Sequence, residues 1–335
     1  MTEPGSELEN LLTRALQNAL DDSPASAFTR MNIRNGIVRD DAALIDIFER
    51  IAGPDQAEVD LHLEGPGVEG HSTNAKYFAQ FVSGISDAVK ETAKSRVGKG
   101  RYSEHLLIEG VGPGSVRVVL RAPTPRVPKG ELPIDEISAS TVDSDALRSI
   151  VAILTHASSD EEESPLVAEL LDLPPTARRG LKRATTTTNE AGWSIKGSVR
   201  QRNIGAEDVV LTPQGAFRLR QSLDAQVESR VEETMVGNID GFRRSLSTLY
   251  FQPEGSARII QAAVLDLEIA ATITDLFAQP DLMVEVVFEV IETYLPGDKT
   301  HPRRSRSVQS IRRVGMGRQL TIEAGEDIPE QPPLQ

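Results

Sequence analysis

Apolar residues recur at helical spacing in the first twenty residues of the chain. Leu8, Leu12 and Leu16 lie four positions apart, and the sequence Asp21-Asp22-Ser-Pro ends the pattern. This spacing predicts an amphipathic helix, whose apolar stripe needs a cover. We expect the chain's own domain to cover it, since exposed stripes are rare. The alternative is a protein partner that contacts Leu8, Leu12 and Leu16. A second short helix is predicted over residues 41–52.

The next part of the chain combines a strand, a long helix and two more strands. Residues 58–64 alternate between apolar and charged side chains, which is typical of a half-buried strand. Residues 74–97 carry apolar side chains on one helical face, and residues 105–109 and 115–121 have the pattern of strands. A β-α-β-β unit with one polar sheet face predicts an α+β domain rather than a doubly wound sheet.

The middle of the chain is mainly helical. A helix is predicted over residues 142–157, and further helical turns over 165–184, interrupted at Pro174-Pro175. The acidic run SSDEEES between them is interpreted as solvated. We therefore divide the chain into an α+β domain with the N-terminal helix (1–135), a linker and helical connector (136–190), a β-rich domain (191–320) and a disordered tail (321–335).

The C-terminal third of the chain is rich in strand patterns. The segment from Trp193 to Arg202 alternates as a strand, and Thr212-Pro213 predicts the start of a helix. After this helix, five β-like runs surround one further helix at residues 265–277. The five runs are residues 231–239, 245–252, 257–262, 282–293 and 307–314.

The order β-β-β-α-β-β resembles the OB-fold, a five-stranded barrel with its helix between the third and fourth strands. The resemblance covers residues 231–314, about a quarter of the chain, and rests on element order. It implies a ligand across the second and third strands and between the first and fourth connecting loops. Because the fourth loop is rich in arginine, the resemblance implies that nucleic acid or another anion binds there. The implicated residues are Lys299, Arg303, Arg304, Arg306, Arg312, Arg313, Arg243, Arg244 and Tyr250.

Positive charge is concentrated in an otherwise acidic chain. The formal net charge is −14, yet residues 299–318 contain seven Lys or Arg and no Asp or Glu, which leaves about −21 for the rest. This distribution favours an anionic partner locally, whether nucleic acid, another protein's acidic face or carboxylates of this chain. The overall negative charge opposes non-specific DNA binding. If Arg303, Arg304 and Arg306 lie in an exposed loop, replacing them with Ala is expected to leave stability nearly unchanged.

Two further motifs have a structural interpretation. Residues 65–70, Gly-Pro-Gly-Val-Glu-Gly, match the G-x-G-x-x-G pattern of phosphate-binding loops. However, Pro66 lacks an N–H donor and Glu69 places negative charge where phosphate would lie, so we interpret the segment as a turn. His71, beside two hydroxyl residues, resembles a nucleophile pair, but a cap at the start of the long helix explains the same residues.

The composition excludes several kinds of site. The chain has no cysteine, hence no disulfide, thiol nucleophile or thiolate-bound metal, and its five histidines lack metal-binding spacing. No metal and no cofactor is therefore predicted. No apolar run approaches the roughly 20 residues needed to cross a bilayer, and the first residues lack the features of a signal peptide. We expect a cytoplasmic location and no membrane partner.

The hypothesis that these patterns favour is a protein that binds rather than catalyses. According to this hypothesis, the chain is a subunit of a larger assembly, such as a regulatory or defence complex, and contacts a protein partner. A homo-oligomer is also compatible with these patterns. The alternatives are recognition of single-stranded nucleic acid or a nucleotide by the barrel, and an unrecognised enzyme. An exposed apolar patch would favour the assembly subunit. A basic groove beside exposed Tyr250 or Phe251 would favour recognition of nucleic acid, and a deep pocket that joins His71 to carboxylates would favour an enzyme.

Overall fold

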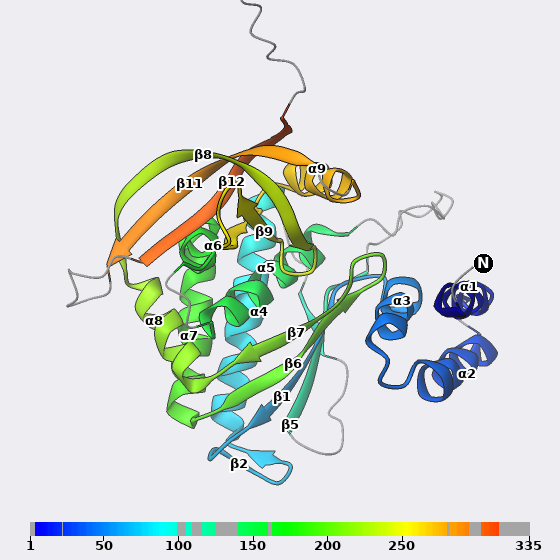
Figure 1. Ribbon diagram of the computed structural model, residues 1–335. Helices are drawn as coiled ribbons and strands as arrows, with labels where there is room; N and C mark the ends of the chain where they lie inside the picture. Colours follow the sequence, from blue (N-terminus) through cyan, green and yellow to red (C-terminus); the bar gives the residue numbers. More distant parts are fainter. Residues whose placement is uncertain are drawn as a thin grey trace, which may run out of the picture.

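The computed structural model describes residues 4–21, 23–98, 105–108, 116–124, 140–159, 163–279, 282–294 and 303–314 (Figure 1). These residues form an N-terminal helical lobe, an antiparallel sheet covered by helices, and a C-terminal barrel. The predicted α+β class is confirmed. The predicted disordered tail at 321–335 lies outside the described residues. Within the described part of the chain, no helix has the length and apolar character that a membrane crossing requires.

The N-terminal lobe consists of α1 (Pro4–Gln17), α2 (Pro24–Ile33), the π-helical turn η1 (Arg34–Val38) and α3 (Ala42–Ala52). Its small core contains Leu12 and Leu16 from α1 together with apolar residues of the other three segments. α3 joins the lobe to the main sheet by packing against β6 and β7. The chain itself therefore covers most of the apolar stripe of α1. This agrees with the expectation that the stripe packs within its own domain.

The main sheet has the strand order β4-β5-β1-β6-β7 and is antiparallel throughout. On β1, the side chains of Val59, Leu61 and Leu63 point into the core, as their alternation predicts. The strands are β1 (Glu58–Glu64), β4 (Leu107–Ile108), β5 (Val116–Arg121), β6 (Ser194–Gln201) and β7 (Gly205–Leu211).

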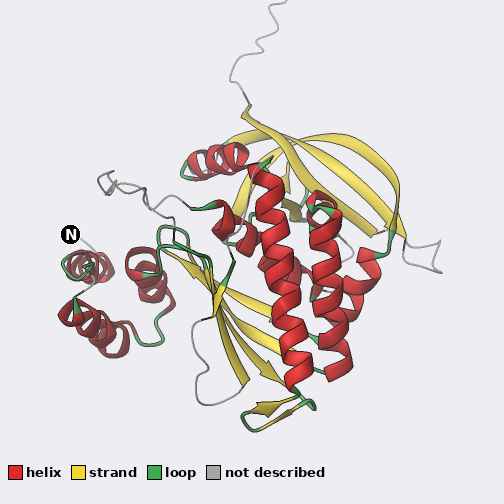
Figure 2. Ribbon diagram, turned by 180° about the vertical axis from the view of Figure 1, so that it is seen from behind, coloured by secondary structure: helices red, strands yellow, loops and turns green. Residues whose placement is uncertain are grey.

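Four helices cover one face of this sheet (Figure 2). They are α4 (Ala75–Val97), α5 (Val142–Ala157), α7 (Pro175–Ala191) and α8 (Pro213–Leu223). α4 and α7 approach each other closely at Gly84 and Gly180. An added Cβ at Gly180 would lie 2.8 Å from the Gly84 carbonyl oxygen. The two glycines therefore allow the backbones of these helices to touch.

The domain boundary differs from the one drawn at residue 191. β6 pairs with β1 along its whole length, from Glu58 with Arg200 to Glu64 with Ser194, so it belongs to the N-terminal sheet. β7 extends the same sheet beyond β6. The sequence pattern identifies β6 as a strand, but each pairing partner lies at least 130 residues away, and local alternation carries no information about it.

The C-terminal strands form a closed barrel in the order β10-β12-β11-β8-β9. All its strand pairs are antiparallel except β10 with β12. Phe251 and Phe288 meet in its core with ring centroids 5.5 Å apart. The predicted order β-β-β-α-β-β is confirmed. The elements are β8 (Gln226–Arg243), β9 (Thr248–Pro253), β10 (Ile260–Ala263), α9 (Leu267–Phe277), β11 (Met283–Tyr294) and β12 (Arg303–Arg313).

Two element boundaries in the barrel differ from the sequence prediction. β8 continues beyond residue 239, where the first β-like run was expected to end, and extends through Asp240 and Gly241 to Arg243. Its pairing with β9 shifts in register between Ile239 and Gly241. β12 begins at Arg303 and not at Ser307, because Arg303 and Arg304 pair in register with β11. The arginines expected in the last loop therefore lie on a strand.

The short helix α6 (Leu166–Asp172) joins the barrel to the helical layer. Val167 and Ala168 pack against Ala263 of β10 and Ile291 of β11. The backbone N–H of Ala168 also donates a hydrogen bond of 3.0 Å to the Ser305 hydroxyl on β12. The outer surface of the barrel at these three strands is thus occupied by the protein's own chain.

Candidate functional site

The arginines of β12 face carboxylates on the neighbouring strand β11. Arg304 and Glu292 are direct cross-strand partners, and so are Arg312 and Glu285. In both pairs the arginine Nε lies 2.8 Å from a carboxylate oxygen. The hydrogen bond from Arg304 lowers the pKa of Glu292 below its usual value. These two pairs compensate two of the five positive charges on β12.

Arg306 is the most enclosed member of the β12 row. Its side chain is only 5% exposed, and its guanidinium lies 2.5 Å from Glu163 Oε2 and 3.4 Å from Glu233 Oε2. Glu163 belongs to the acidic run SSDEEES, which was expected to be solvated. Its contact with Arg306 corrects that interpretation at this position. The pair joins the connector before α6 to the barrel.

The other predicted anion-binding residues lie two strands away in the barrel order. Arg243 stacks over the Tyr250 ring at 5.3 Å from its centroid and pairs with Glu207 Oε1 at 2.9 Å. Burial raises the pKa of Glu207, while Arg243 acts in the opposite direction. Arg244 donates to the Asn203 carbonyl at 3.4 Å. Tyr250 is partly exposed, whereas Phe251 is buried inside the barrel.

The predicted anion-binding residues do not converge on one surface. Arg303 starts β12, where it has an interaction partner, and Arg313 ends the strand with an exposed side chain. Lys299 lies outside the described residues. The five arginines of β12 follow one strand beside carboxylates, and Tyr250 is separated from them by intervening strands. The basic groove that the nucleic-acid hypothesis requires is not formed by the described members of this set.

Charged side chains on the polar face of the main sheet are also paired with one another. Arg117 Nε and Nη2 contact the two carboxylate oxygens of Asp60 at 2.8 and 2.6 Å. Arg200 donates to Glu58 at 3.0 Å through Nε. The bidentate Arg117–Asp60 pair and the Arg200–Glu58 pair each link β1 to a neighbouring strand. The polar sheet face predicted from the alternation in β1 is thus present, and these charges have a structural role.

The G-x-G-x-x-G segment forms a small hairpin of β2 (Val68–Glu69) and β3 (Ser72–Thr73). Gly65 has a φ of +115°, and a Cβ on Gly67 would lie 2.2 Å from the Ala191 carbonyl oxygen. Asn74 caps α4 by accepting hydrogen bonds from the next turn. The glycines therefore serve a turn packed closely against the end of α7, in agreement with the structural interpretation. His71 is exposed at the tip of this hairpin.

A buried polar triad connects the barrel to the helical layer. His156 Nδ1 on α5 lies 3.0 Å from both carboxylate oxygens of Glu169 on α6. His156 Nε2 lies 3.1 Å from the Thr248 hydroxyl on β9. The arrangement has the connectivity of a hydrolase triad, but Thr248 is completely buried and no substrate can reach its hydroxyl. We assign it a role in domain docking.

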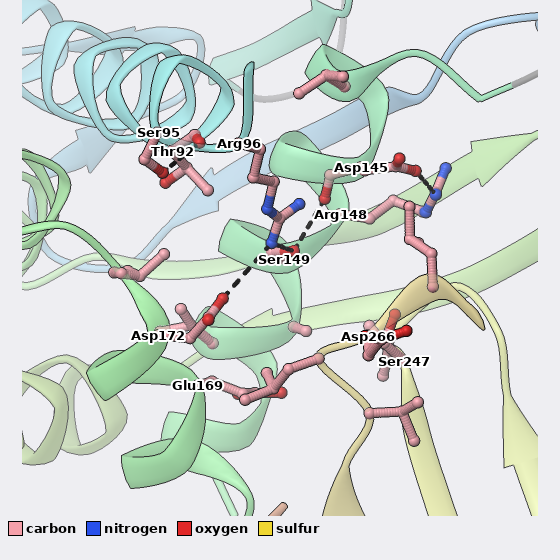
Figure 3. Close-up of a pocket in the computed structure, with 18 of the residues that line it drawn as sticks. Thr92, Ser95, Arg96, Asp145, Arg148, Ser149, Glu169, Asp172, Ser247 and Asp266 are labelled. Carbon is pink, nitrogen blue, oxygen red and sulfur yellow. Dashed lines mark hydrogen bonds and ion pairs between the residues drawn. The ribbon is translucent and has the colours of Figure 1, made fainter. Parts of the chain in front are cut away.

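A cavity of about 660 Å³ lies beside this triad, between the helical layer and the barrel (Figure 3). Arg96 on α4 donates to the Ser149 hydroxyl at 2.9 Å and lies 3.8 Å from Asp172 on α6. Asp266 lines the barrel side, where it caps α9 by accepting from the N–H groups of Glu268 and Ile269 at 2.7 and 3.2 Å. No sequence motif marks this cavity, because its lining comes from segments that are far apart in the chain.

A second space of about 220 Å³ adjoins the first and shares Asp145, Arg148, Ser247 and Leu267 with it. Arg148 is 7% exposed and pairs with Asp145 and with Gln201. Burial lowers the pKa of the Arg148 guanidinium, and the charges of Arg244 and Arg96 act in the same direction. The two spaces form one cleft, which we call the interdomain cleft. Within the described residues, no group of three or more side chains could hold a metal ion.

The N-terminal lobe exposes several large apolar side chains. On α2, Phe28 is 61% exposed and Met31 is 50% exposed, while only Ser26 and Ile33 of this helix are buried. We use the name lobe surface for the exposed apolar residues Leu8, Leu11, Phe28, Met31 and Ile37. Of the residues predicted to contact a partner, Leu8 belongs to this surface. Leu12 and Leu16 are buried in the lobe's own core, so no partner can contact them while the lobe is folded.

Comparison with known proteins found no matching protein-family model, no similar curated protein and no similar solved structure.

Proposed function

We propose that the protein is a non-catalytic subunit of a larger cytoplasmic assembly and that it binds a protein partner through the lobe surface. The observation that carries this proposal is the poor coverage of α2. A helix of ten residues has marginal stability on its own, and apolar side chains are usually covered. Phe28 and Met31 are instead exposed on a helix that has few buried residues. A partner would supply the missing cover.

The position of the lobe supports the same proposal. The lobe lies at one side of the molecule in both views, with α1 and α2 beyond α3 (Figures 1 and 2). A partner can therefore approach α1 and α2 without displacing the sheet or the barrel. The ion pairs along β12 make nucleic acid a weaker candidate ligand, because phosphate would have to compete with Glu285 and Glu292 for the arginines.

The double variant Phe28→Ser, Met31→Ser is expected to lose the partner and keep its stability. Both side chains are exposed, so the free energy of unfolding should change by less than about 1 kcal/mol. Affinity purification of the tagged full chain from its source cells, followed by quantitative mass spectrometry, measures the loss. The expected result is a co-purifying protein that is reduced at least about tenfold by the double variant, which corresponds to about 1.4 kcal/mol of binding free energy.

A matched control removes two equally exposed apolar residues elsewhere. Phe217 on α8 is 49% exposed and Val231 on β8 is 59% exposed. The variant Phe217→Ser, Val231→Ser should retain the partner at the wild-type level. Equal recovery of every co-purifying protein by the wild type and by both variants would show that the lobe surface does not bind a partner.

A further inference from the structure

The interdomain cleft has the size and position of a small-molecule site. Its larger part measures about 660 Å³, within the range of roughly 300–1,000 Å³ found for ligand pockets, which often lie between domains. The wall on one side comes from α4, α5 and α6, and the wall on the other from the end of β10 and the start of α9. This site is separate from the lobe surface and does not depend on it.

The charges around the larger cavity are mainly negative. Five carboxylates line it, against the two arginines Arg96 and Arg148, and a third arginine, Arg244, lines the smaller part of the cleft. Arg148 pairs with Asp145, His156 contacts Glu169, and Arg96 lies at a loose 3.8 Å from Asp172. A cleft lined mainly by one sign of charge concentrates ligands of the opposite sign.

Two of the carboxylates have no cationic partner among the described residues. Asp266 accepts both of its capping hydrogen bonds through Oδ1, and its Oδ2 receives none from the described part of the chain. Glu268 is exposed at the first turn of α9. The start of the helix stabilises these charges in part. Asp172 lies across the space from Asp266 in Figure 3, so acidic groups are present on both walls.

Apolar and hydroxyl side chains line the same cavity as the acidic groups. Val264, Leu265 and Leu173 supply aliphatic surface, and Ser95 and Ser247 supply hydroxyl oxygens that can accept hydrogen bonds. A ligand that matches this lining carries positive nitrogens separated by methylene groups. We propose that the interdomain cleft binds a linear organic polycation of the polyamine class, with one ammonium group beside Asp172 and another beside Asp266 and Glu268.

Titration of the full chain with spermidine by isothermal calorimetry tests this assignment. The expected result is saturable binding of one spermidine per chain at about 150 mM salt, where charge attraction is screened beyond about 8 Å. Spermidine should also raise the melting temperature, because a ligand that binds only the folded state stabilises it. The variant Asp266→Asn, Glu268→Gln should weaken binding at least about tenfold. Asn is also a good N-cap, so α9 should remain folded.

A control variant separates the cleft from the general acidity of the chain. Asp240→Asn, Glu254→Gln removes the same number of charges from exposed positions on β8 and after β9. Spermidine should bind this variant as tightly as the wild type. The assignment is overturned if the wild type shows no saturable binding, or if the two double variants bind spermidine equally well.

Discussion

Replacement of Arg306 with Ala should destabilise the protein by about 2–3 kcal/mol, because a charge-assisted hydrogen bond is lost and a partly buried carboxylate loses its nearest cation. Arg306 is 5% exposed and pairs with Glu163 at 2.5 Å, so its removal leaves the partly buried Glu163 carboxylate with only the exposed Arg258, at 3.5 Å, at the junction of the connector and the barrel. The urea concentrations at the midpoints of unfolding of the wild type and the variant measure this effect.

The matched control is Arg304→Ala, two residues earlier on the same strand. Arg304 is exposed and pairs with Glu292 on the barrel surface, so its loss should cost no more than about 1 kcal/mol. If both variants lose a similarly small amount of unfolding free energy, the Arg306–Glu163 pair does not stabilise the junction. A large loss for Arg306→Ala alone would also overturn the expectation that the arginines near the last loop can be replaced without cost.

The substitution Gly180→Ala should also destabilise the protein, by about 2–3 kcal/mol. Alanine normally stabilises a helix by about 1 kcal/mol relative to glycine. At Gly180, however, the new methyl group would lie 2.8 Å from the Gly84 carbonyl oxygen and 2.9 Å from the Ala88 backbone nitrogen. Both atoms belong to the backbone of α4, so the two helices would have to separate.

Gly36→Ala provides the control for this prediction. A Cβ at Gly36 would meet no atom within 4 Å, so the same added methyl group should cause no steric destabilisation. Thermal unfolding followed by circular dichroism compares the two variants with the wild type. If Gly180→Ala melts at or above the melting temperature of the wild type, the close crossing of α4 and α7 does not require glycine at position 180.

The barrel was predictable because its pattern is local. The alternation in residues 282–293 and the helical spacing in residues 265–277 each identify an element without any knowledge of its partner. The start of β12 was missed because Arg303, Arg304 and Arg306 follow a Pro/Gly turn and resemble a charged loop. Their carboxylate partners on β11 and before α6 become visible only when the strands pair.

The features that depend on long-range contacts could not be predicted. Nothing in the local pattern of β6 indicates that it pairs with β1, and the helix α2 was not predicted because its apolar residues are few and exposed. The interdomain cleft is a stronger example. Arg96, Asp172 and Asp266 lie on three elements that are far apart in the sequence, and none belongs to a recognisable motif.

Site-specific photo-cross-linking in the source cells tests the proposed docking of a partner on the lobe most directly. A photoreactive amino acid at position 28 should give a covalent adduct with another polypeptide, because Phe28 is 61% exposed on the poorly covered helix α2. The same amino acid at position 231, equally exposed on β8, should give no such adduct. An adduct that contains two copies of this chain would identify the partner as a second subunit. The absence of any adduct at position 28, or equal adducts at both positions, would contradict the account.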